Sequence, residues 1–207
     1  MALSLPSGIT LFFARHGETI ANRQGRFQGR TIDTALTSLG IEQARTIARI
    51  MQRNVDDLSR FSRISSSLPR ARHTMEIVLS TLGLRSDSYA IDDRIIEIDL
   101  GAWDGLTKQE ARALNPVAYD ARDADKWNVR STDSRENYSD VARRATSWIC
   151  DLKTDTFAIS HGAFTRILRG LLAGASWQEM SALDEPQGCV FRAHEGVVER
   201  LNLQDQG

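Results

Sequence analysis

The sequence predicts an α/β fold: a single-domain three-layer sandwich in which helices cover both faces of a largely parallel sheet with an antiparallel C-terminal edge. Short apolar runs typical of buried strands alternate with amphipathic stretches typical of helices, which is the order of a parallel sheet. Two such runs, 11–14 and 156–160, lead into His-Gly pairs. The last two, 189–191 and 197–201, flank Glu195-Gly196 and indicate a hairpin at a sheet edge.

Length and composition are those of one globular domain. The chain has 207 residues, enough to bury one substantial core, and no repeat or low-complexity stretch suggests a second. We therefore expect one domain over 1–207, with its core at about 9–201. The 26 Lys and Arg residues balance 27 Asp and Glu residues, which argues against a nucleic-acid-binding surface but leaves room for a local arginine pocket.

The N-terminal segment and the cysteines predict a cytoplasmic protein without a membrane span. Residues 1–8 carry no basic region of the signal-peptide type, and the apolar run 9–14 is too short for a signal core or a membrane span. Cys150 and Cys189 have neither metal-binding nor redox spacing, and both lie in apolar surroundings. We expect them to be reduced core residues.

The first half of the chain predicts two strand-to-helix units. A polar, glycine-containing loop is expected over 22–33, and Thr37 is placed to cap a helix. The apolar positions of that helix recur at steps of three and four: Ile41, Ala44, Ala48 and Met51. A second strand is expected over 61–65, followed by a helix that Gly83 ends.

The second half contains a polar interruption and then a third strand-to-helix unit. A short strand is expected at 89–91, and Thr107 to Glu110 has the capping-box pattern of a helix start, which Asn115-Pro116 interrupts. The segment 116–134, rich in Asp and Arg, is interpreted as a lid or excursion from the core, or else as a solvated surface loop. A helix is expected over 137–152.

The strand at 156–160 is followed by another predicted helix. Its inward-facing apolar positions are Phe164, Ile167, Leu168 and Leu171. His161-Gly162 therefore stands at the carboxyl end of its strand as His16-Gly17 does at the end of the first, where open α/β sheets bind ligands.

The tripeptide Arg15-His16-Gly17 is suited to phosphoryl chemistry. A guanidinium can hold phosphoryl oxygens while a neutral imidazole nitrogen attacks phosphorus, and the glycine lets the backbone turn without a Cβ clash. The tripeptide alone is equally compatible with a solvated Arg-His pair at a strand end. The remaining motifs decide between the two interpretations.

Four motifs occur in a fixed order along the chain: Arg15-His16-Gly17-Glu18 with Asn22, Ser66 to Arg70 before a helix, Glu97 before Leu100 to Gly105, and Ser160-His161-Gly162. Together they resemble the histidine phosphatase superfamily, also called the phosphoglycerate mutase-like family. The resemblance covers about residues 9–201.

The resemblance implies a catalytic role for five residues. His16 would be the nucleophile that becomes phosphohistidine. An imidazole with an ordinary pKa is neutral in a substantial fraction of molecules near pH 7, which this role requires. Arg15, Arg70 and a protonated His161 would surround the phosphoryl oxygens, and nearby phosphate would favour that protonation. Glu97 would donate a proton to the leaving alkoxide and later take one from water.

Further positions carry alternatives. Asp99 or Glu18 would be the acid instead of Glu97 if the alignment with the family slips. Asn22 would donate to the phosphoryl oxygens or would cap its own backbone in a turn. Gln28 lies in the loop after the nucleophile, where family members contact substrate, and is counted with Gly162 as a substrate-binding position.

The resemblance therefore implies a metal-independent phosphomonoester hydrolase with no cofactor, acting through phosphohistidine on a small phosphorylated metabolite. We expect no nucleic-acid or membrane partner, and a homodimer is left open. Substrate selectivity would come from 22–33 and 116–134, and the physiological substrate is not predicted.

Three alternatives remain. A phosphoglycerate mutase-type phosphoryl transferase is the second choice after a phosphatase. Mutases of the family carry a long insertion before the second His-Gly, whereas only 63 residues lie between Glu97 and His161 here. The pair Arg143-Arg144 is interpreted as surface charge on a helix rather than as the arginine pair that binds a phosphoglycerate carboxylate. His16, Glu18 and His161 also fit the loose two-histidine, one-carboxylate pattern of non-haem iron oxygenases. A non-catalytic phospholigand-binding module is the third.

Overall fold

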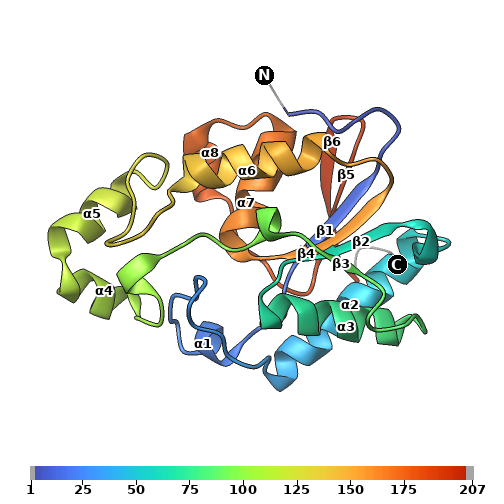
Figure 1. Cartoon of the computed structure of the whole chain (residues 1–207), viewed down its shortest axis with the longest axis horizontal. Helices are drawn as coiled ribbons and strands as arrows, with labels where there is room; N and C mark the ends of the chain where they lie inside the picture. The colour runs from blue at the N-terminus through green and yellow to red at the C-terminus, as the bar shows by residue number, and fades with distance from the viewer. Residues whose placement is uncertain (1–2, 204–207) are drawn as a thin grey trace.

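The computed structural model describes residues 3–203, and one mixed sheet of six strands forms its centre (Figure 1). The strands are β1 (Leu11–Arg15), β2 (Ser62–Ser65), β3 (Ala90–Ile91), β4 (Thr156–Ser160), β5 (Val190–His194) and β6 (Val197–Leu201). Their order is β3-β2-β4-β1-β5-β6, with β1 to β4 parallel and β5 antiparallel to both of its neighbours. The predicted α/β class and its antiparallel C-terminal edge are confirmed.

Helices cover both faces of this sheet. The described residues form α1 (Ile20–Arg23), α2 (Ser38–Asn54), α3 (Pro69–Thr81), α4 (Lys108–Leu114), α5 (Pro116–Ala124), α6 (Tyr138–Cys150), α7 (Gly162–Ala173) and α8 (Trp177–Ala182). Figure 1 shows α2 and α3 on one side of the sheet and α6, α7 and α8 on the other. Single 3-10 turns occur at Leu58–Arg60, Asp93–Ile95 and Gly101–Trp103.

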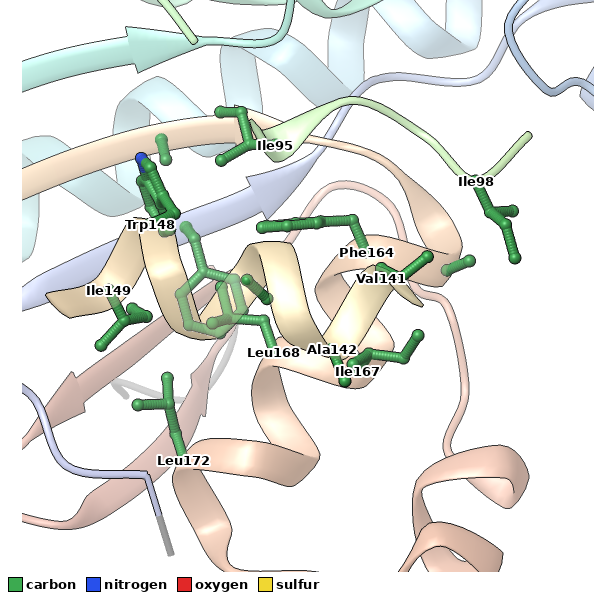
Figure 2. Packing of buried hydrophobic residues seen from close by; sticks show 14 of the residues in the cluster. Ile95, Ile98, Val141, Ala142, Trp148, Ile149, Phe164, Ile167, Leu168 and Leu172 are labelled. Atoms are coloured by element: carbon green, nitrogen blue, oxygen red, sulfur yellow. The ribbon is translucent and has the colours of Figure 1, made fainter. Parts of the chain in front are cut away.

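The alternation of side chains along β1 explains the two covered faces. Leu11 and Phe13 pack into the cluster formed with α6 and α7, whereas Phe12 and Ala14 pack into the cluster formed with α2 and α3. Figure 2 shows the first cluster, in which Trp148 of α6 lies near residues of α7. Burial of both faces accounts for an apolar run without polar alternation.

The strand order creates a crevice between β1 and β4. These two strands are neighbours, and Arg15 pairs in register with Ser160. From β1 the chain continues through α2 to β2, on the far side of β4, whereas from β4 it continues through α7 to β5, on the far side of β1. Because the connections leave in opposite directions, the carboxyl ends of these strands form a ligand-binding switch point.

The predicted starts and stops of helices agree with the structure. The Thr37 hydroxyl accepts a hydrogen bond from the amide of Gly40, and Thr107 forms a capping box with Glu110. Gly83 follows the end of α3 with a positive φ of 71°, a conformation that glycine adopts without a steric penalty. Pro116 separates α4 from α5 and lies in the first turn of the latter.

Three expectations about individual side chains were wrong. Cys150 is exposed rather than buried, because it follows Trp148 by two positions and therefore points about 200° away from that inward-facing residue. Leu171 is only half-buried, and Leu172 takes the inward position instead. Arg144 is not surface charge: its side chain is 14% exposed and pairs with Glu136.

The segment 116–134 is partly helical rather than a continuous loop. Its first nine residues form α5, which stands with α4 apart from the helices that flank the sheet (Figure 1). Its end returns to the core, where the Ser131 hydroxyl donates to the carbonyl of Leu100 at 2.9 Å. Between residues 3 and 203, no helix has the length and apolar character needed to cross a membrane.

Candidate active site

Two buried histidines lie side by side at the crevice between β1 and β4. The ring centroids of His16 and His161 are 5.2 Å apart, and the side chains meet edge to face. The amide of His16 donates to the carbonyl of Ser160, which ties the two strand ends together at 2.9 Å. Gly17 is required here, because a Cβ at this position would collide with the carbonyl of Gly40 at the start of α2.

Hydrogen bonds set the tautomer of His16. Its Nδ1 lies 2.8 Å from the carbonyl oxygen of Gly17, which can only accept, so Nδ1 carries the proton. Its Nε2 accepts from Nε of Arg70 at 3.2 Å and is therefore unprotonated. Burial, followed by the guanidinium groups of Arg70 and Arg15, holds the pKa of His16 well below its usual range. The ring is a neutral base with its Nε2 lone pair beside a cation.

Arg70 is held rigidly in the first turn of α3. Its side chain is fully buried, and Nη1 donates to Asp33 at 2.6 Å while Nη2 donates to the carbonyl of Gly29 at 2.8 Å. Asp33, at the end of the predicted loop, was not singled out from the sequence as a site residue. Its carboxylate fixes the guanidinium in a charge-assisted hydrogen bond, which orients Nε toward His16.

His161 is buried against Ser66, in surroundings that disfavour its charged form when no phosphoryl group is present. The His161 Nε2 shares a 2.7 Å hydrogen bond with the Ser66 hydroxyl, and its Nδ1 has no partner in the described part of the chain. Burial first, then the charges of Arg70 and His16, hold the pKa of His161 well below its usual range. The ring is therefore neutral without a ligand, and an imidazolium requires the negative charge of a bound phosphoryl group.

Arg15 faces a carboxylate, that of Glu185, which no sequence motif marks as a site residue. The backbone carbonyl of Glu185 accepts from Nη1 of Arg15 at 2.7 Å, and its carboxylate lies 3.9 Å from the same nitrogen and 3.2 Å from Nη2 of Arg166. Gly162 makes room for this group, because a Cβ there would lie 2.5 Å from Glu185 Oε2. The Nε atom of Arg15 is buried and has no partner among residues 3–203.

The surroundings of Glu97 favour the protonated form of its carboxyl group more than water does. Burial raises its pKa, and the nearby Glu185 carboxylate raises it further, against the opposing effects of a backbone hydrogen bond, Arg70 and Arg15. The Glu97 carboxyl group accepts from the amides of Ile98 and Ala163 at 2.9 and 3.3 Å. These contacts place Glu97 near the start of α7, where His161 also lies.

The two alternative acids serve the local fold. Asp99 accepts from the amides of Gly101 and Arg135 and so holds a turn. Glu18 accepts from the Thr37 hydroxyl at 2.6 Å. Neither lines the pocket that contains Glu97 and His16. Because Glu18 is engaged away from the histidines, the two-histidine, one-carboxylate grouping is not assembled, and no metal-binding cluster of His, Cys, Asp and Glu occurs in residues 3–203.

Asn22 and Gln28 border the pocket, with their side chains partly committed to the loop. The Asn22 Oδ1 accepts from the amide of Thr19, as in the turn alternative, and from Gln187. The Gln28 side chain accepts from the Thr19 hydroxyl and donates to that of Thr34. A donor role toward a ligand stays a prediction for both.

One pocket of about 240 Å³ brings together Arg15, His16, Glu97 and Glu185, with Asn22 and Gln28 at its border. Arg70, His161 and Gly162 lie behind its wall and are not among the lining residues. Its wall combines the end of β1 and the loop that follows it, the segment after the 3-10 turn Asp93–Ile95, side chains of α4 to α7 and the loop after α8. The lining residues are Arg15, His16, Asn22, Arg26, Phe27, Gln28, Glu97, Ile98, Leu100, Lys108, Arg122, Lys126, Tyr138, Ala163, Arg166 and Glu185. Two larger pockets, one around Phe61 and Arg192 and one around Ile64 and Tyr89, contain none of the predicted site residues.

Comparison with known proteins finds phosphatases and also a probable phosphoglycerate mutase of Erwinia tasmaniensis, 31% identical over 62% of this chain and 52% of that protein. The chain is 33% identical over 175 residues to a glucosyl-3-phosphoglycerate phosphatase of Mycolicibacterium vanbaalenii, covering 79% of this chain and 74% of that protein. It is 27% identical to human 6-phosphofructo-2-kinase/fructose-2,6-bisphosphatase 4 over 186 residues, which cover 88% of this chain but only 37% of the relative. These names support phosphatase activity here.

Solved structures of two phosphatases share the fold of this chain over most of its length. The α-ribazole phosphatase of Shigella flexneri superposes with a TM-score of 0.79 at 27% identity, covering 94% of this chain and 96% of the other. A mycobacterial glucosyl-3-phosphoglycerate phosphatase in complex with VO3 superposes with a TM-score of 0.74 at 25% identity, covering 89% and 90%. Since the model of the histidine phosphatase superfamily (branch 1) matches residues 11–199, the chain belongs to that superfamily.

Proposed function

We propose that this protein is a metal-independent phosphomonoester hydrolase that acts through a phosphohistidine intermediate on a small phosphorylated metabolite. One observation carries the proposal: His16 is a neutral imidazole whose unprotonated Nε2 lies against the Arg70 guanidinium. That arrangement provides a nucleophile and a binding group for the phosphoryl oxygens in the same place. We further propose that the enzyme works in the cytoplasm.

In the first step, Nε2 of His16 attacks phosphorus, so a P–N bond forms as the bond to the leaving oxygen breaks. The Nε–H of Arg70, which points at Nε2 in the free protein, would turn to a phosphoryl oxygen and release the lone pair. Arg15 offers its unpartnered Nε to the same group. Glu97 gives its proton to the leaving oxygen, which departs as an alcohol.

In the second step, the Glu97 carboxylate takes a proton from water while the water oxygen attacks phosphorus. The P–N bond breaks, which returns a neutral His16, a protonated Glu97 and inorganic phosphate. Burial and Glu185 support this cycle because both raise the pKa of Glu97 and so favour recovery of its proton. Two arginines supply positive charge at the phosphoryl oxygens without a metal ion.

A hydrolysis screen over a panel of phosphomonoesters in excess chelator tests the proposal. We expect phosphate release from at least one substrate, and the rate should be the same with and without chelator because the arginines carry the charge. The panel includes phosphoglycerates, with a parallel assay for phosphoryl transfer between their positions.

The alternatives give different results in that screen. Strict dependence on added Mg²⁺, Zn²⁺ or iron would contradict the metal-independent mechanism. Phosphoryl transfer to phosphoglycerate faster than transfer to water would indicate a mutase. Binding of phosphorylated ligands without turnover would indicate a non-catalytic module.

Glu185→Gln should move the pH dependence of catalysis. Because the Glu185 carboxylate raises the pKa of Glu97, its neutralisation should lower that pKa. Glu97 must be protonated to act as the acid, so the alkaline limb of the kcat/KM profile should shift to lower pH. The full profile, measured with an alkyl phosphate, gives this readout separately from any change in maximal rate.

Glu195→Gln is the matched control for this experiment. Its side chain is 81% exposed, and it belongs to the turn between β5 and β6, outside the pocket. The alkaline limb of the kcat/KM profile of this control should lie at the same pH as in the wild-type protein. A limb that stays in place in Glu185→Gln as well would show that the two carboxyl groups are not coupled.

A further inference from the structure

Glu97 lies in a segment that is neither helix nor strand, between the 3-10 turns Asp93–Ile95 and Gly101–Trp103. Its backbone is therefore not fixed by the hydrogen bonds of a sheet or a helix. The residue is only 7% exposed, and buried peptide groups need hydrogen-bond partners. Side chains from other parts of the chain supply those partners here.

Arg30, in the loop after α1, holds the peptide group of Glu97. Its Nε donates to the Glu97 carbonyl at 2.7 Å, and its Nη2 donates to the Glu136 carboxylate, also at 2.7 Å. The Glu136 side chain is 15% exposed and that of Arg30 is 29% exposed, so water screens this pair only in part. The carboxylate fixes one side of the guanidinium fork, and the other side holds the backbone.

Glu136 connects two further backbone groups of the same segment. Its Oε2 accepts from the amide of Asp99 at 3.3 Å, and its Oε1 accepts from Nε of Arg144 at 3.2 Å. Nη1 of Arg144 in turn donates to the carbonyl of Arg94 at 2.7 Å. One carboxylate thus holds the chain on both sides of Glu97, directly at Asp99 and through Arg144 at Arg94.

The Glu97 carboxyl group itself has weaker anchors. One of its two hydrogen bonds comes from the amide of Ile98, the next residue, which moves with Glu97. The other comes from the amide of Ala163 in α7 and is 3.3 Å long. Arg30 and Glu136 do not line the pocket, so they act on the backbone of Glu97 rather than on a ligand.

We propose that Arg30 and Glu136 are positioning residues, which hold the backbone of Glu97 so that its carboxyl group meets the leaving oxygen of the substrate. This inference rests on the proposed phosphatase function. A displacement of about 1 Å can lower a rate by about a hundredfold. Loss of either residue should therefore weaken protonation of the leaving group.

The dependence of the rate on the leaving group provides the first test. Arg30→Gln should lower kcat/KM for glycerol 3-phosphate about tenfold more than kcat/KM for p-nitrophenyl phosphate, because only the alkoxide needs the proton of Glu97. Glu136→Gln should change the ratio in the same direction. Arg30→Lys keeps the charge but lacks the fork that spans both acceptors, so its effect should be smaller.

Arg45→Gln and Glu42→Gln are the matched controls. These residues also form an arginine–glutamate pair, at 3.3 Å on α2, but their side chains are 51% and 48% exposed and lie outside the pocket. Both controls should keep the wild-type ratio. Thermal melts establish that each variant is folded, and Arg30→Lys takes the place of Arg30→Gln in every measurement if the latter does not fold.

A double variant separates positioning from general support of the fold. Addition of Arg30→Gln to Glu97→Gln should not slow hydrolysis of glycerol 3-phosphate further, because a residue that acts through Glu97 has no acid left to position. A further tenfold loss in the double variant would overturn the proposal.

NMR titration of the Glu97 carboxyl carbon, in glutamate-labelled protein, tests the same role without turnover. The signal is assigned by its absence in Glu97→Gln. Burial raises the pKa of Glu97, so a looser position should lower that pKa by about half a unit or more in Arg30→Gln. Removal of a nearby cation by itself would raise the pKa, so the two causes have opposite signs.

The outcomes distinguish this proposal from the phosphatase proposal. A lowered pKa of Glu97 in Arg30→Gln, without hydrolysis of any substrate by the wild-type protein, would support the anchoring of Glu97 and contradict only the phosphatase function. An unchanged or raised pKa in the folded variant would overturn the positioning role. An unchanged ratio of the two kcat/KM values in folded variants of both Arg30 and Glu136 would overturn it as well.

Discussion

Replacement of His16 by alanine is expected to abolish phosphomonoester hydrolysis, with a loss of at least about a thousandfold, the scale seen when a catalytic nucleophile is removed. The reason is geometric: no other described nitrogen in the pocket combines an unprotonated lone pair with an adjacent guanidinium as His16 Nε2 does. The ring borders the pocket, so its removal enlarges an existing space rather than the core.

Trapping of the covalent intermediate is the measurement. Brief exposure to labelled substrate should leave acid-labile, base-stable phosphate on the wild-type protein and none on His16→Ala. His73→Ala is the matched control, because His73 is an exposed histidine on α3 outside the pocket and should retain labelling. Undiminished turnover in a well-folded His16→Ala protein would remove the covalent mechanism.

The placement of the two histidines could be predicted because it depends on sheet geometry. Neighbouring parallel strands end at the same edge, so His16 and His161 meet once β1 pairs with β4. The same argument could have selected Ser66, which directly follows β2 and shares a hydrogen bond with His161. A strand end was thus a sufficient signal for a third group at this edge.

The electrostatic state of the site could not be predicted from sequence. The tautomer of His16 depends on two contacts that only the folded chain shows: Nδ1 with the carbonyl of Gly17, and Nε2 with Arg70, which lies 54 positions away in the chain. The neutral state of His161 depends on complete burial among cations. Glu185 lies in the loop after α8, and no sequence motif surrounds it. Its carboxylate is found in the site only because the folded chain packs it closely against Gly162.

Arg122 illustrates a different limit of sequence reasoning. A polar segment rich in Asp and Arg predicts exposure, since unpaired arginine is rarely buried. Here the rings of Trp103 and Tyr138, from elements before and after α5, cover the guanidinium. The sequence analysis predicted that the segment 116–134 contributes to substrate selectivity and so lies near the site. The burial of Arg122 could not be predicted, because it depends on tertiary contacts.

Substitution of Glu97 by glutamine should slow hydrolysis in a way that depends on the leaving group. An alkoxide leaves poorly without a proton, so the rate with glycerol 3-phosphate should fall by about a hundredfold or more, the usual scale of general acid catalysis. The leaving group of p-nitrophenyl phosphate departs largely unaided. Phosphorylation of His16 by that substrate should therefore be much less impaired.

Pre-steady-state kinetics separate the two duties of Glu97. With p-nitrophenyl phosphate, Glu97→Gln should release a rapid burst of nitrophenol as His16 is phosphorylated. Slow turnover should follow, because the glutamine amide cannot take the proton of the attacking water. The phosphohistidine should accumulate in this variant and be recoverable after an acid-free quench.

The comparison with Asp99→Asn and Glu18→Gln decides which carboxyl group is the acid. Both residues bind backbone amides or hydroxyls of the local fold and lie outside the pocket lining, so their variants should slow the two substrates by the same factor if they slow them at all. Glu97→Gln alone should change the ratio of the two rates. An equal slowing of the burst phase for both substrates in Glu97→Gln would exclude leaving-group protonation by Glu97. A change in the ratio of the two rates in Asp99→Asn or Glu18→Gln would instead assign the acid role to the residue replaced in that variant.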